Sequence, residues 1–114
     1  MCGGRIIVAN LEEIVRYSEL LILYQGLLSP TQKDILEDYF SYNLSISEIA
    51  ENRNISRAAV EDAIKKGKKK LDQFETEISS LKALEVIREI KQESNDEKIT
   101  SKLDEVERIM KHGI

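Results

Sequence analysis

One stretch, from Leu44 to Lys66, constrains the fold more than any other part of the chain. Ser45 and Glu48 have the spacing of a capping box, in which each side chain satisfies a backbone N–H at a helix start. The helical pattern stops at residues 52–54, which include two asparagines, and asparagine tolerates the left-handed conformation that redirects a chain. Ser56 is then suited to cap a second helix. The pattern predicts a helix-turn-helix.

Small and branched apolar residues give both helices an inward face. Ala50 is small enough for the second helix to cross closely over the first. Ile55 is expected to tuck under the corner between them. The inward residues are Ile46, Ile49 and Ala50 in the first helix, and Val60, Ala63 and Ile64 in the second. A generic helical hairpin is the alternative to this motif.

Two helices are predicted before the motif. The first begins at Leu11 under an Asn10 cap, and its second half has apolar residues on more than one side, which favours burial between other helices or against a second subunit. The second begins at Ser29, with Gln32 expected to close a capping box, and runs to about Tyr42. A left-handed asparagine, Asn43, is expected to end it.

No residue after Ile64 breaks the helix except Gly67, which a helix tolerates at about 1 kcal/mol relative to alanine. A seam then follows on one long helix, formed by Ile64, Leu71, Phe74, Ile78, Leu81, Leu84, Ile87 and Ile90. The seam is able either to fold back on the first helix or to pair with a second copy, and a homodimer is expected from the large apolar surface. A polar loop at residues 91–98, with Asn95 as a candidate cap, precedes a last amphipathic helix.

The chain is therefore expected to be all-α, since it has only one proline and five glycines among 114 residues. We expect a frayed segment at residues 1–10, a helix-turn-helix domain at residues 11–75 and a C-terminal helical extension at residues 76–114. The longest apolar stretch, Leu20 to Leu28, is too short to span a bilayer, and no signal peptide is recognised. A cytoplasmic protein is expected.

Charge is distributed unevenly along the sequence. The net charge is −4, whereas residues 53–70 contain seven basic and two acidic residues and therefore carry +5. A basic patch on an acidic protein is typical of a surface that meets phosphate, although a solvated lysine-rich helix is the alternative. The candidate DNA-binding residues are Ser56, Arg57, Ala58, Glu61, Lys65, Lys66, Lys68, Lys69 and Lys70.

Within this set, Arg57 is the candidate for a guanine because it lies in the first turn and can bind in a bidentate way. The lysines are the candidates for phosphate contacts. Two observations weigh against DNA: Glu61 and Asp62 repel phosphate, and Arg57, Glu61 and Lys65 are spaced to pair with one another along the helix.

Catalytic chemistry is not indicated by the sequence. The only histidine is His112, close to the end of the chain, and the only cysteine is Cys2, which has no neighbouring ligands. No glycine-rich phosphate loop or nucleophilic set is present. We therefore expect no catalytic, cofactor or metal site, and a protein that is not an enzyme.

A family resemblance covers about residues 16–75. Its residues are Tyr24, Leu27, Leu28, Gln32, Tyr39, Phe40, Leu44 to Ala50, Ser56 to Val60, Asp62, Ile64, Lys65, Leu71 and Glu75. These resemble the YlxM family of small bacterial proteins, which in turn resembles the DNA-binding region 4 of sigma factors, a helical class related to winged helices but without the wing. The resemblance implies a role in the signal recognition particle pathway or in regulating its genes.

Two function classes follow from these patterns. The first is a DNA-binding regulator whose second motif helix enters the major groove. The second is a non-enzymatic interaction module that binds a protein or RNA of the signal recognition particle, and the acidic pair Glu61–Asp62 favours it. The sequence also departs from the family at Arg53, Asn54 and Glu61.

Overall fold

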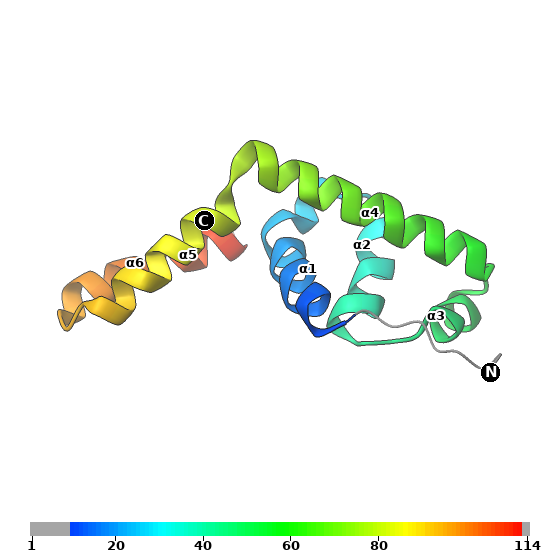
Figure 1. The fold of residues 1–114 in the computed structure, drawn as a ribbon, viewed down its shortest axis with the longest axis horizontal. Coiled ribbons are helices and arrows are strands. Elements are labelled where there is room, and N and C mark those ends of the chain that lie inside the picture. The colour runs from blue at the N-terminus through cyan, green and yellow to red at the C-terminus, as the bar shows by residue number, and fades with distance from the viewer. Residues whose placement is uncertain (1–9, 113–114) are drawn as a thin grey trace.

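The computed structural model describes residues 10–112, which are helical throughout apart from short connections (Figure 1). The predicted all-α class is confirmed. The predicted N-terminal segment, with Cys2, lies outside the described residues except for Asn10. The elements are α1 (Leu11–Tyr24), η1 (Gln25–Leu27), α2 (Pro30–Leu36), η2 (Glu37–Ser41), α3 (Ile46–Arg53), α4 (Arg57–Ile78), α5 (Ser80–Glu93) and α6 (Glu97–His112).

The caps predicted for the first two helices form, with one exception. The Asn10 side chain accepts from the Glu13 N–H, and the Ser29 hydroxyl accepts from the Gln32 N–H. The Gln32 side chain does not close the predicted box, because its Oε1 accepts instead from Lys70 Nζ on α4 at 3.1 Å. The second helix ends in the five-residue π-helical segment η2, and Asn43 follows with a φ of 54° as predicted.

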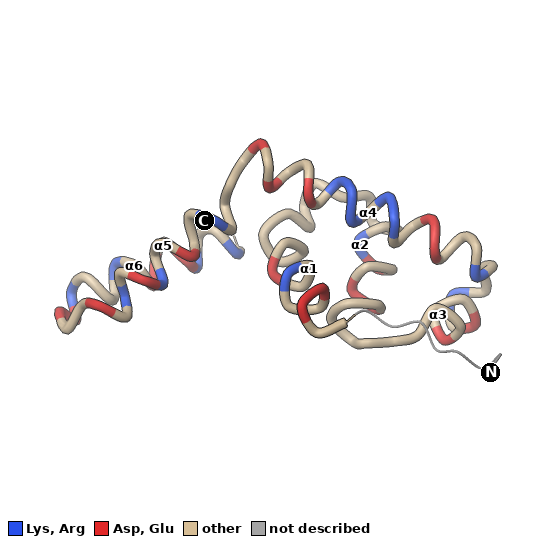
Figure 2. Tube along the Cα trace, viewed as in Figure 1, with Lys and Arg blue, Asp and Glu red and all other residues tan. Residues whose placement is uncertain are grey.

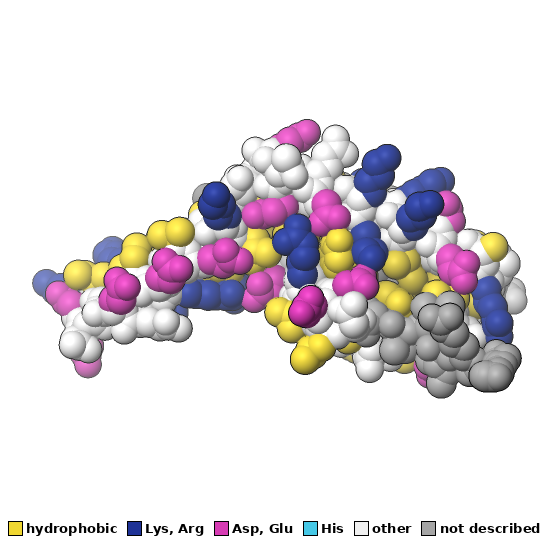
Figure 3. Space-filling model, in the orientation of Figure 1, with side chains coloured by type: hydrophobic (Ala, Val, Ile, Leu, Met, Phe, Trp, Pro, Cys, Tyr) yellow, Lys and Arg dark blue, Asp and Glu magenta, His cyan; other side chains and the backbone are white. Residues whose placement is uncertain are grey.

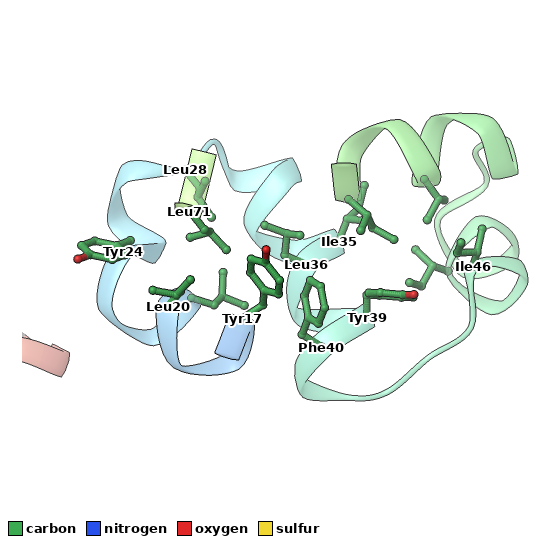
Figure 4. Close-up of a cluster of buried hydrophobic side chains, with 14 of the residues drawn as sticks. Tyr17, Leu20, Tyr24, Leu28, Ile35, Leu36, Tyr39, Phe40, Ile46 and Leu71 are labelled. Carbon is green, nitrogen blue, oxygen red and sulfur yellow. The ribbon is translucent and has the colours of Figure 1, made fainter. Parts of the chain in front are cut away.

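A single core lies where α1, α2 and η2 meet the inner face of α4 (Figure 4). Leu20, Leu36 and Leu71 are fully buried at its centre. The Phe40 ring lies 5.1 Å from the Tyr17 ring and 4.9 Å from the Tyr39 ring, measured between centroids. The buried aromatic rings hold α1 against η2 and so position the platform on which α3 and α4 pack.

The helix-turn-helix forms as predicted in α3 and α4. Glu48 N–H donates to Ser45 Oγ at 3.1 Å, and Ser45 N–H donates to Glu48 Oε1 at 3.0 Å. Asn54 ends α3 with a φ of 55°, and Ile55 N–H donates to the Ala50 carbonyl as in a Schellman motif. Ile55 does not tuck under the corner, because its side chain remains 38% exposed. The turn is therefore held by backbone hydrogen bonds.

Replacing Ser45 with alanine is expected to lower the free energy of unfolding by about 1 kcal/mol, because the Glu48 N–H loses its acceptor at the start of α3. Chemical denaturation followed by circular dichroism measures this. Ser47→Ala is the matched control, since Ser47 is an exposed serine in the first turn of the same helix. Equal midpoints for the two variants would contradict the assigned cap.

The long seam predicted on one helix is interrupted. Ser79 adopts a left-handed conformation with a φ of 61°, which ends α4 and starts α5 in a new direction. Part of the seam folds back on the first helix, one of the two alternatives: Leu81 is buried in the core that α1 contributes to, and α5 contacts α1, whereas Ile90 remains 41% exposed. The prediction of a single helix through residue 90 is therefore wrong, because Ser79 adopts a left-handed conformation that nothing in the helical pattern indicated.

The last two helices form an antiparallel hairpin, residues 80–112, which we call the arm (Figure 1). The connection spans only residues 94–96, and Asp96 rather than Asn95 caps α6, because the Lys98 N–H donates to Asp96 Oδ1 at 2.8 Å. Lys91 joins the two helices through Asp104 and Glu107. The arm extends the molecule to 54 Å along its longest axis, against 29 and 23 Å along the others.

Candidate nucleic-acid interface

The second helix of the motif, α4, is fixed at its start by Ser56. The Ser56 hydroxyl accepts from the Ala59 N–H at 3.0 Å, and the Ser56 carbonyl accepts from the Val60 N–H. The hydroxyl is thus occupied in capping, whereas Arg57 and Ala58 project from the first turn as exposed residues. In helix-turn-helix proteins that bind DNA, the N-terminal residues of the second helix are the ones that contact base edges.

The inner face of α4 is closely packed. Val60, Ile64 and Leu71 are buried against the body, and Gly67 is buried among them. A Cβ at Gly67 would lie 2.6 Å from Leu36 Cδ1 and 3.0 Å from Leu36 Cγ. The glycine therefore makes room for the Leu36 side chain where α2 packs on α4, a role that its position inside a helical pattern did not reveal.

Gly67→Ala is expected to lower the free energy of unfolding by about 1 kcal/mol, since overpacking against the fully buried Leu36 outweighs the gain of about 1 kcal/mol in helix propensity. Gly26→Ala is the control, because no atom lies within 4 Å of a Cβ there. Thermal or denaturant unfolding distinguishes the two. A Gly67→Ala variant that is more stable than the parent would show that α2 has room to shift.

The opposite face of α4 is open to solvent. Residues three and four apart share one side of a helix, and the outermost row is Ala58, Asp62, Lys65 and Lys69, all of them exposed. Lys66 lies beside this row, and its Nζ is 3.0 Å from Asp62 Oδ2. The negative charge of Asp62 at the centre of the face is therefore compensated by Lys66. Basic positions gather along the middle of α4 in the trace of Figure 2, and Lys and Arg side chains project from this part of the molecule in Figure 3.

The charge series expected along α4 does not form. Within residues 10–112, neither Arg57 nor Lys65 makes an ion pair, and Glu61 bridges to neither of them. Glu61 lies on the side of α4 toward α3, in a shallow hollow that Ile46, Ile64, Lys65 and Lys68 also line. Lys69 also has no acidic partner within the described part of the chain. The cationic groups on the open face are therefore available to an anion.

Two of the candidate lysines turn away from this face. Lys68 Nζ bonds to Glu13 on α1 and lies 5.1 Å from the centroid of the Tyr17 ring. Lys70 Nζ donates to the Gln32 amide on α2. The structure thus brings Lys65, Lys66 and Lys69 together on the open face and places Lys68 and Lys70 at the two edges where α4 meets the body. Arg57 is exposed at the free start of α4, on the row that it shares with Glu61 rather than on the open face.

Arg53, the first basic residue of the positively charged segment, is engaged within the chain. Its Nε lies 2.6 Å from Asp38 Oδ2, and its Nη1 lies 4.0 Å from Asp34 Oδ2. The hydrogen bond to Asp38 raises the pKa of the Arg53 guanidinium. Arg53 therefore ties the end of α3 to the preceding helix, and its charge is compensated before any ligand arrives.

The end of α4 carries a joint that the sequence did not reveal. The Tyr24 hydroxyl donates to Glu75 Oε1 at 2.6 Å and accepts from the Ser80 N–H at 3.0 Å. The same carboxylate accepts from the Leu81 and Lys82 N–H groups, so Glu75 caps the start of α5. Burial and the hydrogen bond to Glu75 raise the pKa of Tyr24. Tyr24 and Glu75 are among the residues that carry the family resemblance, and this resemblance was the one feature of the sequence that singled them out.

A second bond of this kind lies one turn earlier on α4. The Tyr17 hydroxyl donates to Asp72 Oδ2 at 2.8 Å, and Arg16 Nη2 lies 3.1 Å from Asp72 Oδ1. Burial, then the hydrogen bond to Asp72, raises the pKa of Tyr17. Together with the Tyr24–Glu75 bond, this contact fixes the rotation of α4 about its axis, and with it the direction of the open face.

Other kinds of site have little support in the described region. Among residues 10–112, no group of three His, Cys, Asp or Glu side chains is placed to hold a metal ion. His112 is exposed at the end of α6. None of the described helices is long and apolar enough to cross a membrane.

Comparison with known proteins agrees with this architecture. Residues 11–111 match the family described as "Putative helix-turn-helix protein, YlxM / p13 like". A UPF0122 protein of Fusobacterium nucleatum is 39% identical over 102 residues, which cover 90% of this chain and 96% of that protein. The UPF0122 protein YlxM of Bacillus subtilis is 32% identical over 108 residues, covering 88% and 98%. The chain therefore belongs to the YlxM / p13-like helix-turn-helix family.

Proposed function

We propose that this protein is a DNA-binding regulator that inserts α4 into the major groove. The observation that carries the proposal is the open face of α4, where Lys65 and Lys69 have no acidic partner within residues 10–112, together with the exposed and equally unpaired Arg57 at the start of the same helix. The other face of the same helix is buried against the body, so the cationic row is held in one direction. A rigid helix with one basic side suits a groove lined by phosphates.

Different residues along α4 take different roles. Arg57 lies in the first turn and is suited to bidentate contact with a guanine, while Ala58 beside it can approach a thymine methyl group. Lys65, Lys66 and Lys69 lie further along and are suited to phosphates. Ser56 acts as the cap, and Lys68 and Lys70 support α4 through α1 and α2. Glu61 lies at the α3 edge, where a carboxylate can accept from a cytosine amine.

A second candidate is a non-enzymatic module that binds a protein or RNA of the signal recognition particle. Asp62 at the centre of the open face favours this candidate. Its carboxylate pairs with Lys66 and so reduces the positive charge that would attract the phosphates of DNA. A-form RNA has a major groove too narrow for a helix, so RNA binding would depend on the lysines and on shape. In either case we propose a cytoplasmic homodimer in which residues 11–75 carry the function and the arm extends from them.

Fluorescence anisotropy at several salt concentrations tests the proposal, with duplex from upstream of the gene, unrelated duplex and signal recognition particle RNA. Arg57→Ala is expected to cost about 1–3 kcal/mol on the preferred duplex and little on the unrelated one. Lys69→Ala is expected to weaken all duplexes and reduce the salt slope by about one unit. Lys82→Ala, on the arm, is the control. Binding to the RNA alone would favour the second candidate.

A further inference from the structure

The arm carries an apolar strip that the rest of the described chain leaves open. Val86 and Ile90 on α5 are 49% and 41% exposed, and Ile99 and Val106 on α6 are 46% and 40% exposed. Within α6 no residue is buried, although its sequence is amphipathic. The strip is therefore larger than the scattered single apolar residues usual on a protein surface.

The exposed residues of the two helices lie on the same side of the arm. Lys91 on α5 forms ion pairs with Asp104 and Glu107 on α6. These pairs identify the side of each helix that faces the other. Arg88 bonds to Glu19 and marks the side of α5 that faces α1. At 3.6 residues per turn, Val86 and Ile90 lie away from both contacts. Figure 3 shows apolar side chains along the upper edge of the arm.

Charges border this strip in a complementary way. On α5, Glu89 and Glu93 follow Val86 and Ile90 by three residues and form the outer border. On α6, Lys98 and Lys102 line a hollow with Ile99 and Leu103 and form the opposite border. Both pairs lie near the tip of the arm. One border is acidic and the other is basic, so the strip is complementary to a copy of itself turned by 180° about the arm axis.

We propose that a second copy of this chain covers the strip, with the two arms parallel and α5 of each copy lying on α6 of the other. The two hairpins then form a four-helix bundle with the apolar residues inside. Lys98 and Lys102 of one copy lie beside Glu89 and Glu93 of the other. An axis perpendicular to the arm is disfavoured, because it places α5 on α5 and brings like charges together.

This arrangement deepens the proposed homodimer and is independent of DNA binding. Because the arms are parallel, both helix-turn-helix bodies lie at the same end of the bundle, and their α4 helices are related by the twofold axis. A protein of this form would contact two half-sites of one duplex. The arm is then the element that determines the spacing of these half-sites.

Sedimentation velocity without DNA tests the interface. The parent protein is expected to be a dimer at about 10 µM, and Val106→Glu is expected to weaken the dimer by at least about 100-fold, since it buries an unpaired carboxylate. Tyr42→Glu is the control, because Tyr42 is 68% exposed and distant from the arm. Circular dichroism verifies that both variants are folded. A dimer that survives Val106→Glu would place the interface elsewhere, and a monomeric parent would overturn the homodimer itself.

Charge exchange tests the orientation of the arms. One variant combines Lys98→Glu with Lys102→Glu, and the other combines Glu89→Lys with Glu93→Lys. Each alone places like charges across the interface and is expected to dissociate more readily than the parent, by about tenfold or more. Mixing the two restores opposite charges at both borders, so a heterodimer is expected. Strong self-association of each variant without heterodimer formation would contradict the parallel arrangement. A partner other than this chain is indicated if all proteins are monomers.

Discussion

The combined replacement of Lys65 and Lys69 by glutamate is expected to weaken binding to every duplex by about 100-fold at 0.1 M salt. Each phosphate contact contributes a salt slope of about 0.9, which corresponds to nearly tenfold in affinity at this concentration, and the introduced carboxylates add repulsion. The salt slope is expected to fall by about two units. Fluorescence anisotropy with specific and unrelated duplexes measures both quantities.

The control is a variant that changes the net charge equally but elsewhere. Lys82→Glu combined with Arg108→Glu places the same two reversals on the arm, where both residues are exposed. This variant is expected to retain most of the parent's affinity. If the two double variants lose affinity to the same extent, the affinity for DNA depends on the net charge of the protein and the open face of α4 has no special role.

The largest loss of stability is expected from Glu75→Ala. This carboxylate accepts from the Tyr24 hydroxyl and from two backbone N–H groups at the start of α5, and Tyr24 is only 2% exposed. Removing it leaves buried donors without an acceptor, so the free energy of unfolding is expected to fall by about 3 kcal/mol. Denaturant unfolding measures the change, and Glu75→Gln is expected to be intermediate because one oxygen remains.

Glu77→Ala is the matched control, since Glu77 is exposed on the same turn of α4 and makes no hydrogen bond within residues 10–112. Its stability is expected to remain within about 0.5 kcal/mol of the parent. A Glu75→Ala variant as stable as Glu77→Ala would show that the joint between α4 and the arm does not depend on this carboxylate.

The local structure could be predicted because its causes lie close together in the sequence. Ser45 with Glu48 and Ser56 with the Ala59 N–H each involve residues three apart, so a short pattern was sufficient to locate α3 and α4. Asn54 likewise identified the turn. The inward face of α4 followed from helical periodicity, and this combination was enough to predict the fold class. The family was identified separately, from a resemblance that covers about residues 16–75.

Contacts between distant residues could not be predicted in this way. Lys68 was assigned to phosphate because it lies in a basic run, but it meets Glu13, which is 55 residues away. Tyr24 and Glu75 are 51 residues apart, and no periodicity identifies them as partners. Ser79 breaks the long helix by its backbone conformation alone. The candidate face is thus narrower than the sequence indicated, because tertiary packing determined which lysines remain open.

The most direct test of the central claim, that the open face of α4 contacts DNA, is an NMR titration of the ¹⁵N-labelled protein with duplex DNA at low salt. The largest amide shift changes are expected in residues 56–69, with small changes in α5 and α6. The amide shifts of Arg57 and Lys65 should follow the same dependence on DNA concentration as the fluorescence anisotropy. Shift changes confined to the arm, or no changes with any duplex, would contradict the assignment of α4 as the DNA-binding helix.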